Sequence, residues 1–494
     1  MLFNSLEFLL FLPTVFAAYW ILNHWTNRPR GLQAQNLLLL IASYVFYGWW
    51  DWRFLSLIAF STLVDFAVGI QIAKANDGEI PKDANDSVRS RTARRWLWVS
   101  LAVNLGLLGY FKYANFFIES WIQAWESMGV TLHASTLHIV LPIGISFYTF
   151  QTLSYSIDIY RRKLNPTNSL IDFAAFVSFF PQLVAGPIER ASALLPQIQR
   201  RRQFDFDVAT SGLQLILWGL FKKVVVADTC AIFVNDIFDN HHEYSGPTLI
   251  LGAVYFAFQI YGDFSGYSDI AIGTARLFGI KLMTNFRTPY FARDIAEFWR
   301  RWHISLSTWF RDYLYIPLGG SRVGKGKAVR NTFAIFLVSG FWHGANWTFV
   351  VWGLIHALLF LPLLLLNRNR KNTGAIADGR WLPSVRELTG MAWTFAVVTL
   401  AWIFFRAESV NHAFDFIANF GNRPTSIDKL SKTGATWVAL MLFMEWMARI
   451  PAAWNLWRSP SLPMTAGRWL SYSLGIWLVM KNLQSQAEFI YFQF

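Results

Sequence analysis

Long runs of apolar residues, separated by short polar or charged connections, constrain this chain more than any other feature. The runs fall near residues 6–23, 36–50, 54–72, 97–117, 136–157, 169–186, 209–235, 247–280, 331–366, 389–405, 434–449 and 467–483. A helix of roughly 20 apolar residues crosses the hydrocarbon core of a bilayer. Backbone polar groups must be bonded internally in lipid, which favours helices. We therefore predict an all-α, polytopic integral membrane protein with about ten transmembrane helices.

Composition agrees with a membrane protein that forms one domain. Hydrophobic residues make up 54% of the 494 residues and charged residues only 15%, against about 25% charged in soluble domains. No linker or repeat divides the sequence, so we predict a single transmembrane domain over residues 1–494. The net charge of +13 would suggest nucleic acid in a soluble protein. Here the basic residues lie mostly in short loops, so membrane topology and anionic lipid explain them better, and no nucleic-acid partner is expected.

The basic loops predict the orientation of the chain, because loops rich in Lys and Arg remain on the cytoplasmic side. Alternate connections are basic, whereas residues 119–136 contain no Lys or Arg. The loops predicted to be cytoplasmic are 73–95, 159–168, 187–207 and 281–330. Both termini are then extracytoplasmic, and the N-terminal run is read as a retained helix rather than a signal peptide. We expect a multi-pass protein of the inner (plasma) membrane.

Two apolar segments have basic residues at both flanks and are predicted to be re-entrant. Residues 169–186 carry Pro181 and Gly186, which do not suit a straight span. In residues 331–366, the first arm from Asn331 to Gly340 would cover only about 15 Å as a helix. That is half of a ~30 Å hydrocarbon core, so the turn that carries His343 would lie deep in the membrane.

His343 is the first candidate for catalysis. An ionisable side chain inside a membrane is costly, and such residues are functional candidates by default. Burial favours the neutral imidazole, which can accept a proton from a hydroxyl group as a general base. The alternative is a core histidine bonded to a backbone carbonyl. That alternative is preferred for His356, which lies further along the same run.

Residues 298–313 form an amphipathic pattern typical of a helix at a membrane interface or a cavity mouth. The apolar face comprises Trp299, Trp302, Leu306, Trp309, Phe310 and Tyr313, and His303 lies at its edge. The glycine-rich, basic segment that follows would suit a phosphate-bearing donor such as a coenzyme A thioester. A positive-inside loop explains the same charges equally well. The candidate donor-binding residues are Arg301, Arg311, Arg322, Lys325 and Lys327.

Asp263 and Asp269 interrupt the apolar run at 247–280. They are six residues apart, about 240° around a helix, so they are not expected to form one carboxylate pair. A structural role in a polar cavity wall is at least as probable as a catalytic one. The single cysteine, Cys230, permits no internal disulfide, and no Cys/His zinc spacing is present, so no metal site is predicted.

Four stretches together resemble the membrane-bound O-acyltransferase (MBOAT) family, in particular its branch of alginate O-acetyltransferase membrane subunits. They are Phe298–Gly320 (FWRRWHISLSTWFRDYLYIPLGG), Gly340–Gly344 (GFWHG), Phe179–Arg190 (FFPQLVAGPIER) and Gln259–Asp269 (QIYGDFSGYSD). The resemblance covers nearly the whole chain. It implies helices around a central tunnel, with His343 at the family's active-site position and His303 at the second polar position. The predicted tunnel-lining or substrate-binding residues are Trp342, Asn346, Asp263, Asp269, Ser307 and Tyr313.

The resemblance implies that the chain passes an acetyl group, with acetyl-CoA as the expected donor and no bound cofactor, toward an extracytoplasmic polysaccharide such as alginate. In this branch a periplasmic SGNH-type acetyltransferase is the partner. D-alanyl or peptidoglycan O-acyl transfer remains an alternative, as does a non-catalytic transporter or flippase. A polyprenol-sugar glycosyltransferase would usually need a large extracytoplasmic domain, which is not evident. Residues 411–420 are amphipathic and predict either a docking helix for the partner or a helix on the outer membrane interface.

Overall fold

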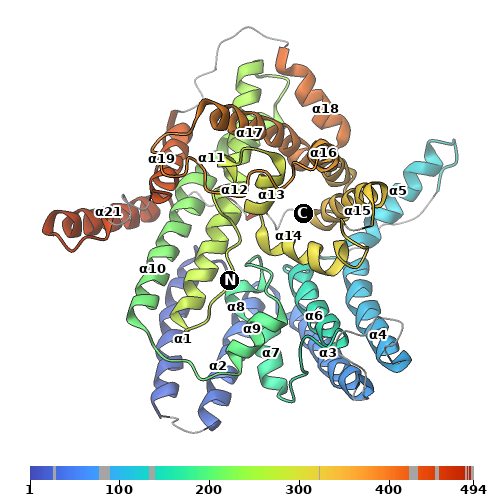
Figure 1. The fold of residues 1–494 in the computed structure, drawn as a ribbon, viewed down its shortest axis with the longest axis vertical. Helices are drawn as coiled ribbons and strands as arrows, with labels where there is room; N and C mark the ends of the chain where they lie inside the picture. The colour runs from blue at the N-terminus through green and yellow to red at the C-terminus, as the bar shows by residue number, and fades with distance from the viewer. Residues whose placement is uncertain are drawn as a thin grey trace. The chain divides into compact units, whose positions relative to one another are not determined.

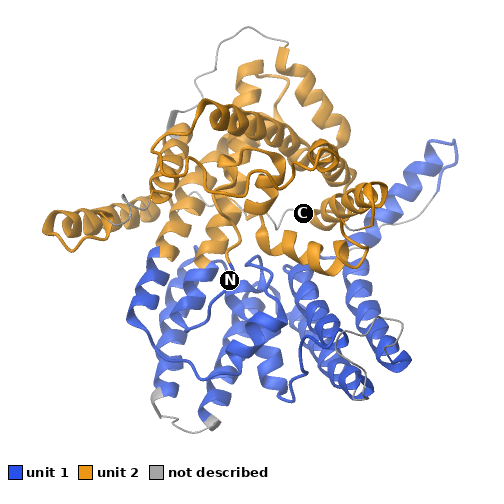
Figure 2. Cartoon of the chain, viewed as in Figure 1, with its two compact units in different colours: residues 1–214, 271–283 blue, residues 215–270, 284–494 orange. Residues whose placement is uncertain are grey.

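The computed structural model describes residues 1–25, 29–76, 90–132, 139–321, 323–421, 432–450, 456–483, 487 and 489–490. Every regular element in these residues is helical, which confirms the all-α prediction (Figure 1). The chain groups into two compact units (Figure 2). Unit 1 comprises residues 1–214 and 271–283, and unit 2 comprises residues 215–270 and 284–494. The single transmembrane domain stays a prediction.

Unit 1 is built from apolar helices of the N-terminal half. They are α1 (Leu6–Trp25), α2 (Pro29–Asp51), α3 (Leu55–Asn76), α4 (Arg91–Leu108), α5 (Ala114–Glu126), α6 (Ile145–Tyr160), α7 (Leu170–Ser178), α8 (Phe180–Leu183) and α9 (Ala191–Ile198). Two of the three boundaries between the units fall within α10 (Phe206–Leu220) and α12 (Gly246–Leu277), and the third follows Met283. Several buried polar side chains in this unit are bonded to one another. For example, Asp65 accepts hydrogen bonds from Ser100, Asn104 and Ser156.

Unit 2 holds the segments that carry most of the candidate chemistry. Its other helices are α11 (Asp228–Asp239), α13 (Ile295–Arg301), α14 (Ile304–Phe310), α15 (Lys325–His343), α16 (Trp347–Leu365), α17 (Val385–Arg406), α18 (Val410–Ala418), α19 (Lys432–Ala448) and α21 (Leu462–Asn482). Two wider π-helical turns, Phe221–Ala227 and Arg311–Tyr315, continue α10 and α14.

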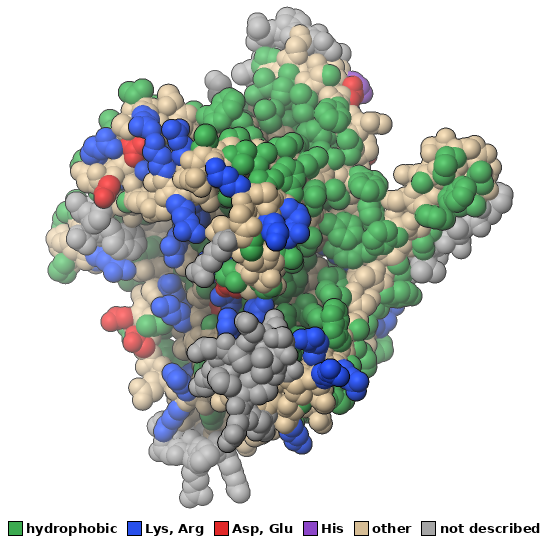
Figure 3. Space-filling view, turned by 45° about the vertical axis from the view of Figure 1, so that its right-hand side comes forward, with side chains coloured by type: hydrophobic (Ala, Val, Ile, Leu, Met, Phe, Trp, Pro, Cys, Tyr) green, Lys and Arg blue, Asp and Glu red, His purple; other side chains and the backbone are tan. Residues whose placement is uncertain are grey.

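Within the residues that the structure describes, five stretches are long and apolar enough to cross a membrane: Leu6–Asn23, Gly31–Asn76, Arg91–Glu126, Trp347–Leu365 and Val385–Arg406. Large apolar side chains in them are exposed, such as Leu10 at 66% and Trp393 at 69%, and broad apolar areas appear on the surface (Figure 3). Such areas are unusual for soluble proteins and suit contact with lipid. The chain is therefore membrane-embedded. The number of about ten spans stays a prediction.

The first predicted re-entrant segment, residues 169–186, is not one straight helix. It consists of α7, with nine residues, and α8, with four. A nine-residue helix covers only about 14 Å, roughly half of a hydrocarbon core. Phe179 interrupts the two helices with extended backbone (φ −50°, ψ 106°). A broken segment of this kind favours the re-entrant interpretation over a straight span.

The second predicted re-entrant segment forms a helical hairpin of α15 and α16, but the expected length of its first arm was wrong. Each helix has 19 residues, which corresponds to about 28 Å. The sequence predicts that the arm begins at Asn331, because the basic residues before it are not apolar. The helix nevertheless begins at Lys325, since charged side chains in a first turn can remain in water while the backbone is helical. His343 is therefore the last residue of a full-length arm.

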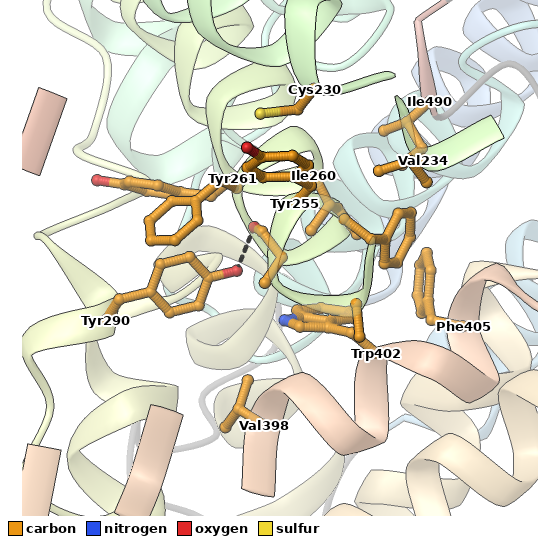
Figure 4. Packing of buried hydrophobic residues seen from close by; sticks show 14 of the residues in the cluster. Cys230, Val234, Tyr255, Ile260, Tyr261, Tyr290, Val398, Trp402, Phe405 and Ile490 are labelled. Atoms are coloured by element: carbon orange, nitrogen blue, oxygen red, sulfur yellow. Dashed lines mark hydrogen bonds between the residues drawn. The ribbon is translucent and has the colours of Figure 1, made fainter. Parts of the chain in front are cut away.

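The core of unit 2 is unusually rich in aromatic side chains. Trp302, Trp352 and Trp402 are all buried, and the ring of Trp402 lies 5.0 Å from Trp302 and 5.5 Å from Trp352. Tyr290 packs beside them and donates a hydrogen bond to the carbonyl of Ala257 at 2.5 Å (Figure 4). Large aromatic side chains bury much apolar area with little loss of rotamer freedom. The core also contacts the candidate site, because the ring of Trp352 lies 5.2 Å from that of His343.

The predicted docking helix at 411–420 corresponds to α18, and its apolar face is already used within unit 2. Ala413 and Phe416 are fully buried, and Phe416 stacks on Phe238 of α11 with ring centroids 4.3 Å apart. Phe414 remains 58% exposed. The face formed by Ala413 and Phe416 therefore cannot serve as an open docking surface in this arrangement.

A candidate active site in unit 2

His303 lies at a break between two short helices. The sequence predicted one continuous helix over 298–313, which is wrong: α13 ends at Arg301 and α14 begins at Ile304. Trp302 is extended, and His303 adopts left-handed backbone with φ 42° and ψ 55°. This conformation is uncommon for a residue other than glycine and costs roughly 1–3 kcal/mol. Contacts with the surrounding residues must offset this strain. Because the helix is broken, the side chain of His303 takes a different direction from the one it would have in a continuous helix.

Asn285 stabilises the break between the helices and determines which ring nitrogen of His303 carries the hydrogen. Its backbone carbonyl accepts the N–H of Ile304 at 2.9 Å, and its side-chain Oδ1 accepts the N–H of Ser305 at 3.2 Å. A backbone N–H can only donate, so the amide oxygen must be the atom that faces this turn. His303 Nδ1 lies 3.1 Å from the same oxygen and must therefore carry the hydrogen. The lone pair is then on Nε2, the nitrogen that can accept a proton.

Burial keeps the imidazole of His303 neutral. The residue is fully buried, and removal from water lowers the pKa of His303 to about 3. Nε2 has no hydrogen-bond partner among the described residues. The ring of His303 packs edge-to-face with Phe264, with ring centroids 4.6 Å apart. The ring centroid of Trp342 lies 6.0 Å from that of His303. His303 therefore presents an unprotonated nitrogen in an apolar surrounding.

His343, the second histidine of the candidate site, is the last residue of α15. It is 3% exposed, and its ring packs edge-to-face against Trp352 at 5.2 Å and Phe405 at 5.4 Å. The ring centroids of His343 and His303 are 6.3 Å apart. The two imidazole rings are therefore near neighbours, and a reacting group that enters beside one ring also lies close to the other. The structure brings together the two histidines that the sequence selected 40 positions apart.

Two glycines hold the hairpin that positions His343. A Cβ at Gly340 would lie 2.2 Å from the carbonyl oxygen of Phe349, and one at Gly353 would lie 2.3 Å from that of Phe336. Only glycine permits this approach of α15 and α16, in the manner of the small-residue contacts between membrane helices. His343 is three residues beyond Gly340, so the close crossing fixes the end of the helix that carries it.

Asp263 and Asp269 belong to a buried ionic network beside the histidines. Lys223 Nζ lies 2.8 Å from Asp228 Oδ1 and 2.9 Å from Asp263 Oδ1. Lys222 Nζ lies 2.6 Å from Asp269 Oδ2. Each aspartate thus has its own lysine, in agreement with the expectation that the two do not form a carboxylate pair.

The network also secures two distant segments. Asp263 Oδ2 accepts the backbone N–H of Ile490 at 2.7 Å, and the hydroxyl of Tyr261 donates to Glu445 on α19 at 2.5 Å. Buried charges without partners are strongly unfavourable, so these ion pairs stabilise the wall on which Phe264 and His303 meet. The geometry favours a structural role for both aspartates.

The other residues predicted to line the tunnel differ in whether they contact His303 and His343. Trp342 is buried, and its ring contacts His343 at 4.9 Å. Asn346 instead caps α16: its Oδ1 accepts the N–H of Thr348, and its Nδ2 donates to the carbonyl of Glu408, both at 3.0 Å. Ser307 is partly buried on α14, and the ring of Tyr313 packs on Trp309 at 4.9 Å. Trp342 is the candidate that directly adjoins both histidines.

The candidate donor-binding residues divide into engaged and open side chains. Arg301 pairs with Glu297 at 2.8 Å, and Arg311 pairs with Asp312 at 2.7 Å. Lys325 and Lys327 are exposed in the first turn of α15, where backbone N–H groups add a favourable field for anions. Arg322 lies outside the described residues. The lysines are therefore the better candidates for a phosphate-bearing donor.

Comparison with known proteins identifies the class. The pattern of the MBOAT, membrane-bound O-acyltransferase family, matches residues 161–405, which include both histidines, Asn285 and the ionic network. Relatives at 36–42% identity align over more than three quarters of both chains. The chain belongs to the membrane-bound O-acyltransferase family and is therefore an O-acyltransferase.

Within that family the chain is similar to enzymes of bacterial polymers. The probable alginate O-acetylase AlgI of Pseudomonas putida is 42% identical over 84% of this chain and 79% of that protein. The peptidoglycan O-acetyltransferase of Helicobacter pylori is 36% identical over 87% of this chain and 82% of that protein. The teichoic acid D-alanyltransferase of Streptococcus thermophilus is 29% identical over 53% of this chain and 68% of that protein.

Sequence reasoning missed Asn285, Lys222 and Lys223. Asn285 is a single amide in a loop, and nothing local distinguishes it from a solvated residue. The two adjacent lysines did carry a signal, because they lie within the apolar run 209–235. Charged residues at such positions usually find partners, and the aspartates of the run 247–280 were the nearest candidates.

Proposed function

We propose that this O-acyltransferase transfers an acetyl group from acetyl-CoA on the cytoplasmic side toward an extracytoplasmic polysaccharide, with His343 as the catalytic base and His303 in support. The observation that carries the proposal is the pair of buried imidazoles with ring centroids 6.3 Å apart. A hydroxyl placed between them can donate its proton to a neutral ring nitrogen while it attacks the thioester carbon. The coenzyme A thiolate leaves, and the acyl group forms an ester with the hydroxyl oxygen.

The donor side is supported by the position of Lys325 and Lys327. They lie in the first turn of the helix that ends at His343, about 27 Å away along the axis. Phosphates of coenzyme A bound at the lysines would thus be held at one end of α15, and the acyl chemistry would take place near the other. A distance close to the ~30 Å of a hydrocarbon core suits an enzyme whose donor and acceptor lie on opposite sides of a membrane.

The acetyl group is favoured over D-alanine by the relatives. The two that align over most of their length are named for O-acetyl transfer to alginate and to peptidoglycan. The protein named for D-alanyl transfer aligns over about half of this chain. Alginate is the acceptor that we favour, and peptidoglycan is the second candidate because the similarity to its enzyme extends over 87% of this chain.

We further propose an inner-membrane location with both termini extracytoplasmic, and a periplasmic SGNH-type acetyltransferase as partner. The alternation of basic and neutral loops supports the orientation. The partner is supported by the absence of a compact soluble domain in the described part of the chain, where the helices form two apolar-surfaced units. A polymer would need a second protein to bind it.

The decisive experiment supplies radiolabelled acetyl-CoA to the purified protein in liposomes. We expect release of coenzyme A to depend on His343 and label to reach alginate only when an SGNH-type acetyltransferase is added. A parallel reaction with peptidoglycan fragments distinguishes the second acceptor. Efficient labelling of free polysaccharide by the chain alone would exclude the partner, and no use of acetyl-CoA under any condition would exclude the donor.

A further inference from the structure

A second cluster of histidines lies where the turn after α11 meets α18, and it is unrelated to the His303 and His343 pair. His241 Nε2 is 2.7 Å from Asp415 Oδ2, and His242 Nε2 is 3.3 Å from the same oxygen. The three potential ligand atoms all lie within 4.8 Å of one another. Ligand atoms of a tetrahedral zinc ion lie roughly 3.3 Å apart. Small rotations of the two exposed side chains, His242 and Asp415, would therefore complete the spacing.

Both ring nitrogens of His241 have a hydrogen-bonding partner, and a cation could take the place of the proton between Nε2 and Asp415 Oδ2. Its Nδ1 lies 3.3 Å from the carbonyl oxygen of Phe238, which can only accept, so Nδ1 must carry a hydrogen. A neutral imidazole then has a lone pair on Nε2, and this lone pair points at a carboxylate oxygen. A metal ion between Nε2 and Oδ2 removes that repulsion without a second proton on the ring. Histidine ligands in metalloproteins commonly donate their other N–H to a backbone carbonyl in this way.

The surroundings of the cluster are arranged as a support for the ligands. Asn419 Nδ2 donates to the second oxygen of Asp415, Oδ1, at 3.4 Å and to its backbone carbonyl at 2.8 Å. The ring of His412 stacks on His241 with centroids 4.7 Å apart. The aromatic contact holds the plane of His241, and the amide holds the carboxylate. The side chain of His242 is 69% exposed, which leaves room for a water ligand.

Local charge also favours a cation. The protein as a whole is strongly basic, yet residues 235–246 contain Asp236, Asp239 and Glu243 and no Lys or Arg. Glu408 and Asp415 add two more acidic residues in 407–421, which likewise lacks Lys and Arg. Arg406 is the nearby exception, and it is paired with Asp239 at 3.4 Å. The region thus attracts cations on a chain that otherwise repels them.

We propose that His241, His242 and Asp415 bind a divalent transition-metal ion of the zinc type, with water in the fourth position. Two imidazoles and one carboxylate suit zinc and related ions, whereas magnesium and calcium prefer oxygen ligands. The ion would join the turn between α11 and α12 to α18. His241 and Asp415 are 174 residues apart in the chain, and the stacks of Phe238 on Phe416 and of His241 on His412 also join the two segments. The role of the ion is to lock α18 onto unit 2.

The test is a metal titration of full-length protein in detergent, purified through a tag without histidine. We expect one zinc ion per chain above the level in Asp415→Asn and His242→Ala, a higher melting temperature with zinc but not with magnesium, and about tenfold or greater weakening of binding in each variant. Cobalt in place of zinc should give the visible absorption typical of tetrahedral coordination. Both substituted side chains are substantially exposed, so the variants should fold.

Glu243→Gln is the matched control, because it removes a negative charge from the same turn without removing a proposed ligand. It should bind zinc like the wild type. Binding that is unchanged in Asp415→Asn and His242→Ala, or equally weakened in Glu243→Gln, would overturn the proposal. So would the lack of any saturable zinc binding to the wild type.

Discussion

At the scale of single residues, the site depends on a histidine that its own backbone does not favour. His303 has φ 42°, and Asn285 holds it there through bonds to the backbone of residues 304 and 305 and to Nδ1. The cost of the left-handed backbone, roughly 1–3 kcal/mol, is offset by these bonds and by the aromatic packing. The outcome is an imidazole whose tautomer and direction are set before any substrate binds.

Replacement of His343 by alanine should reduce acetyl transfer by about 10²–10⁴-fold, because a positioned general base contributes that much to the rate. The variant should still insert and fold. His303→Ala should also impair activity, by a smaller factor. Activity is measured as coenzyme A release and as labelled polymer, with protein amount checked by immunoblot.

The control for that prediction is His356→Leu. His356 is also fully buried on the same hairpin, and its ring packs against Trp299 at 4.9 Å and Trp352 at 4.8 Å between centroids. The backbone-carbonyl bond expected for it is wrong, because neither ring nitrogen has a hydrogen-bond partner among the described residues. It should remain within about threefold of wild-type activity, since no proton transfer is assigned to it. Near-normal acetylation by a well-expressed His343→Ala protein would refute the assignment.

The stability of the fold should depend on pH through His303. Burial lowers the pKa of His303 to about 3, whereas the unfolded chain binds the proton near pH 6.5. The unfolded state therefore holds more protons between these values, and stability is lost as pH falls from about 6.5 toward 3, by about 1.4 kcal/mol per unit at most. Melting curves in detergent at about pH 7.5, 6 and 5 should show a shallower fall for His303→Asn. If the melting temperatures of the wild type and His303→Asn fell equally with pH, the burial of a neutral His303 ring would be contradicted.

At the scale of elements, the hairpin of α15 and α16 is the part that positions His343. Its two helices approach so closely that backbone atoms, not side chains, are the nearest neighbours of Gly340 and Gly353. A backbone cannot move aside as a flexible side chain can. Any added atom must therefore separate the helices and displace His343 from His303.

Gly340→Ala should lower both activity and the melting temperature, since the new Cβ would meet the carbonyl of Phe349 at 2.2 Å. Overpacking of this kind costs roughly 1–3 kcal/mol. Gly326→Ala in the first turn of the same helix is the matched control, because a Cβ there meets nothing within 4 Å. It should be neutral or slightly stabilising. Equal effects of the two substitutions on coenzyme A release would exclude the close crossing as the cause.

At the scale of the whole molecule, orientation is the property that the fold alone does not reveal. The five apolar stretches establish that the chain is embedded in a membrane, but helices carry no mark of which side is cytoplasmic. The charge of the loops supplies that information, because basic loops are retained inside during insertion. Loop charge predicts that residues 119–136 are outside and 281–330 inside.

Single-cysteine labelling measures this orientation directly. The native Cys230 is fully buried, so the wild-type background should be low. Ser127→Cys and Lys281→Cys replace exposed residues, and loop charge predicts that they lie on opposite sides of the membrane. An impermeant maleimide applied from outside should label the first and not the second. Labelling of Ser127→Cys only from the cytoplasmic side would invert the topology.

The sequence by itself determined that the chain is helical and membrane-embedded, because the length of apolar runs is a local property that lipid enforces. It also selected His303 and His343, since ionisable residues among apolar ones stand out. The distance between their rings, the break at Trp302 and the hydrogen bonds from Asn285 were decided only by tertiary structure. The same holds for the lysine partners of Asp263 and Asp269, and for the cluster of His241, His242 and Asp415. These contacts join residues far apart in the chain, and helical periodicity fixes which face a side chain occupies but not which helix it meets.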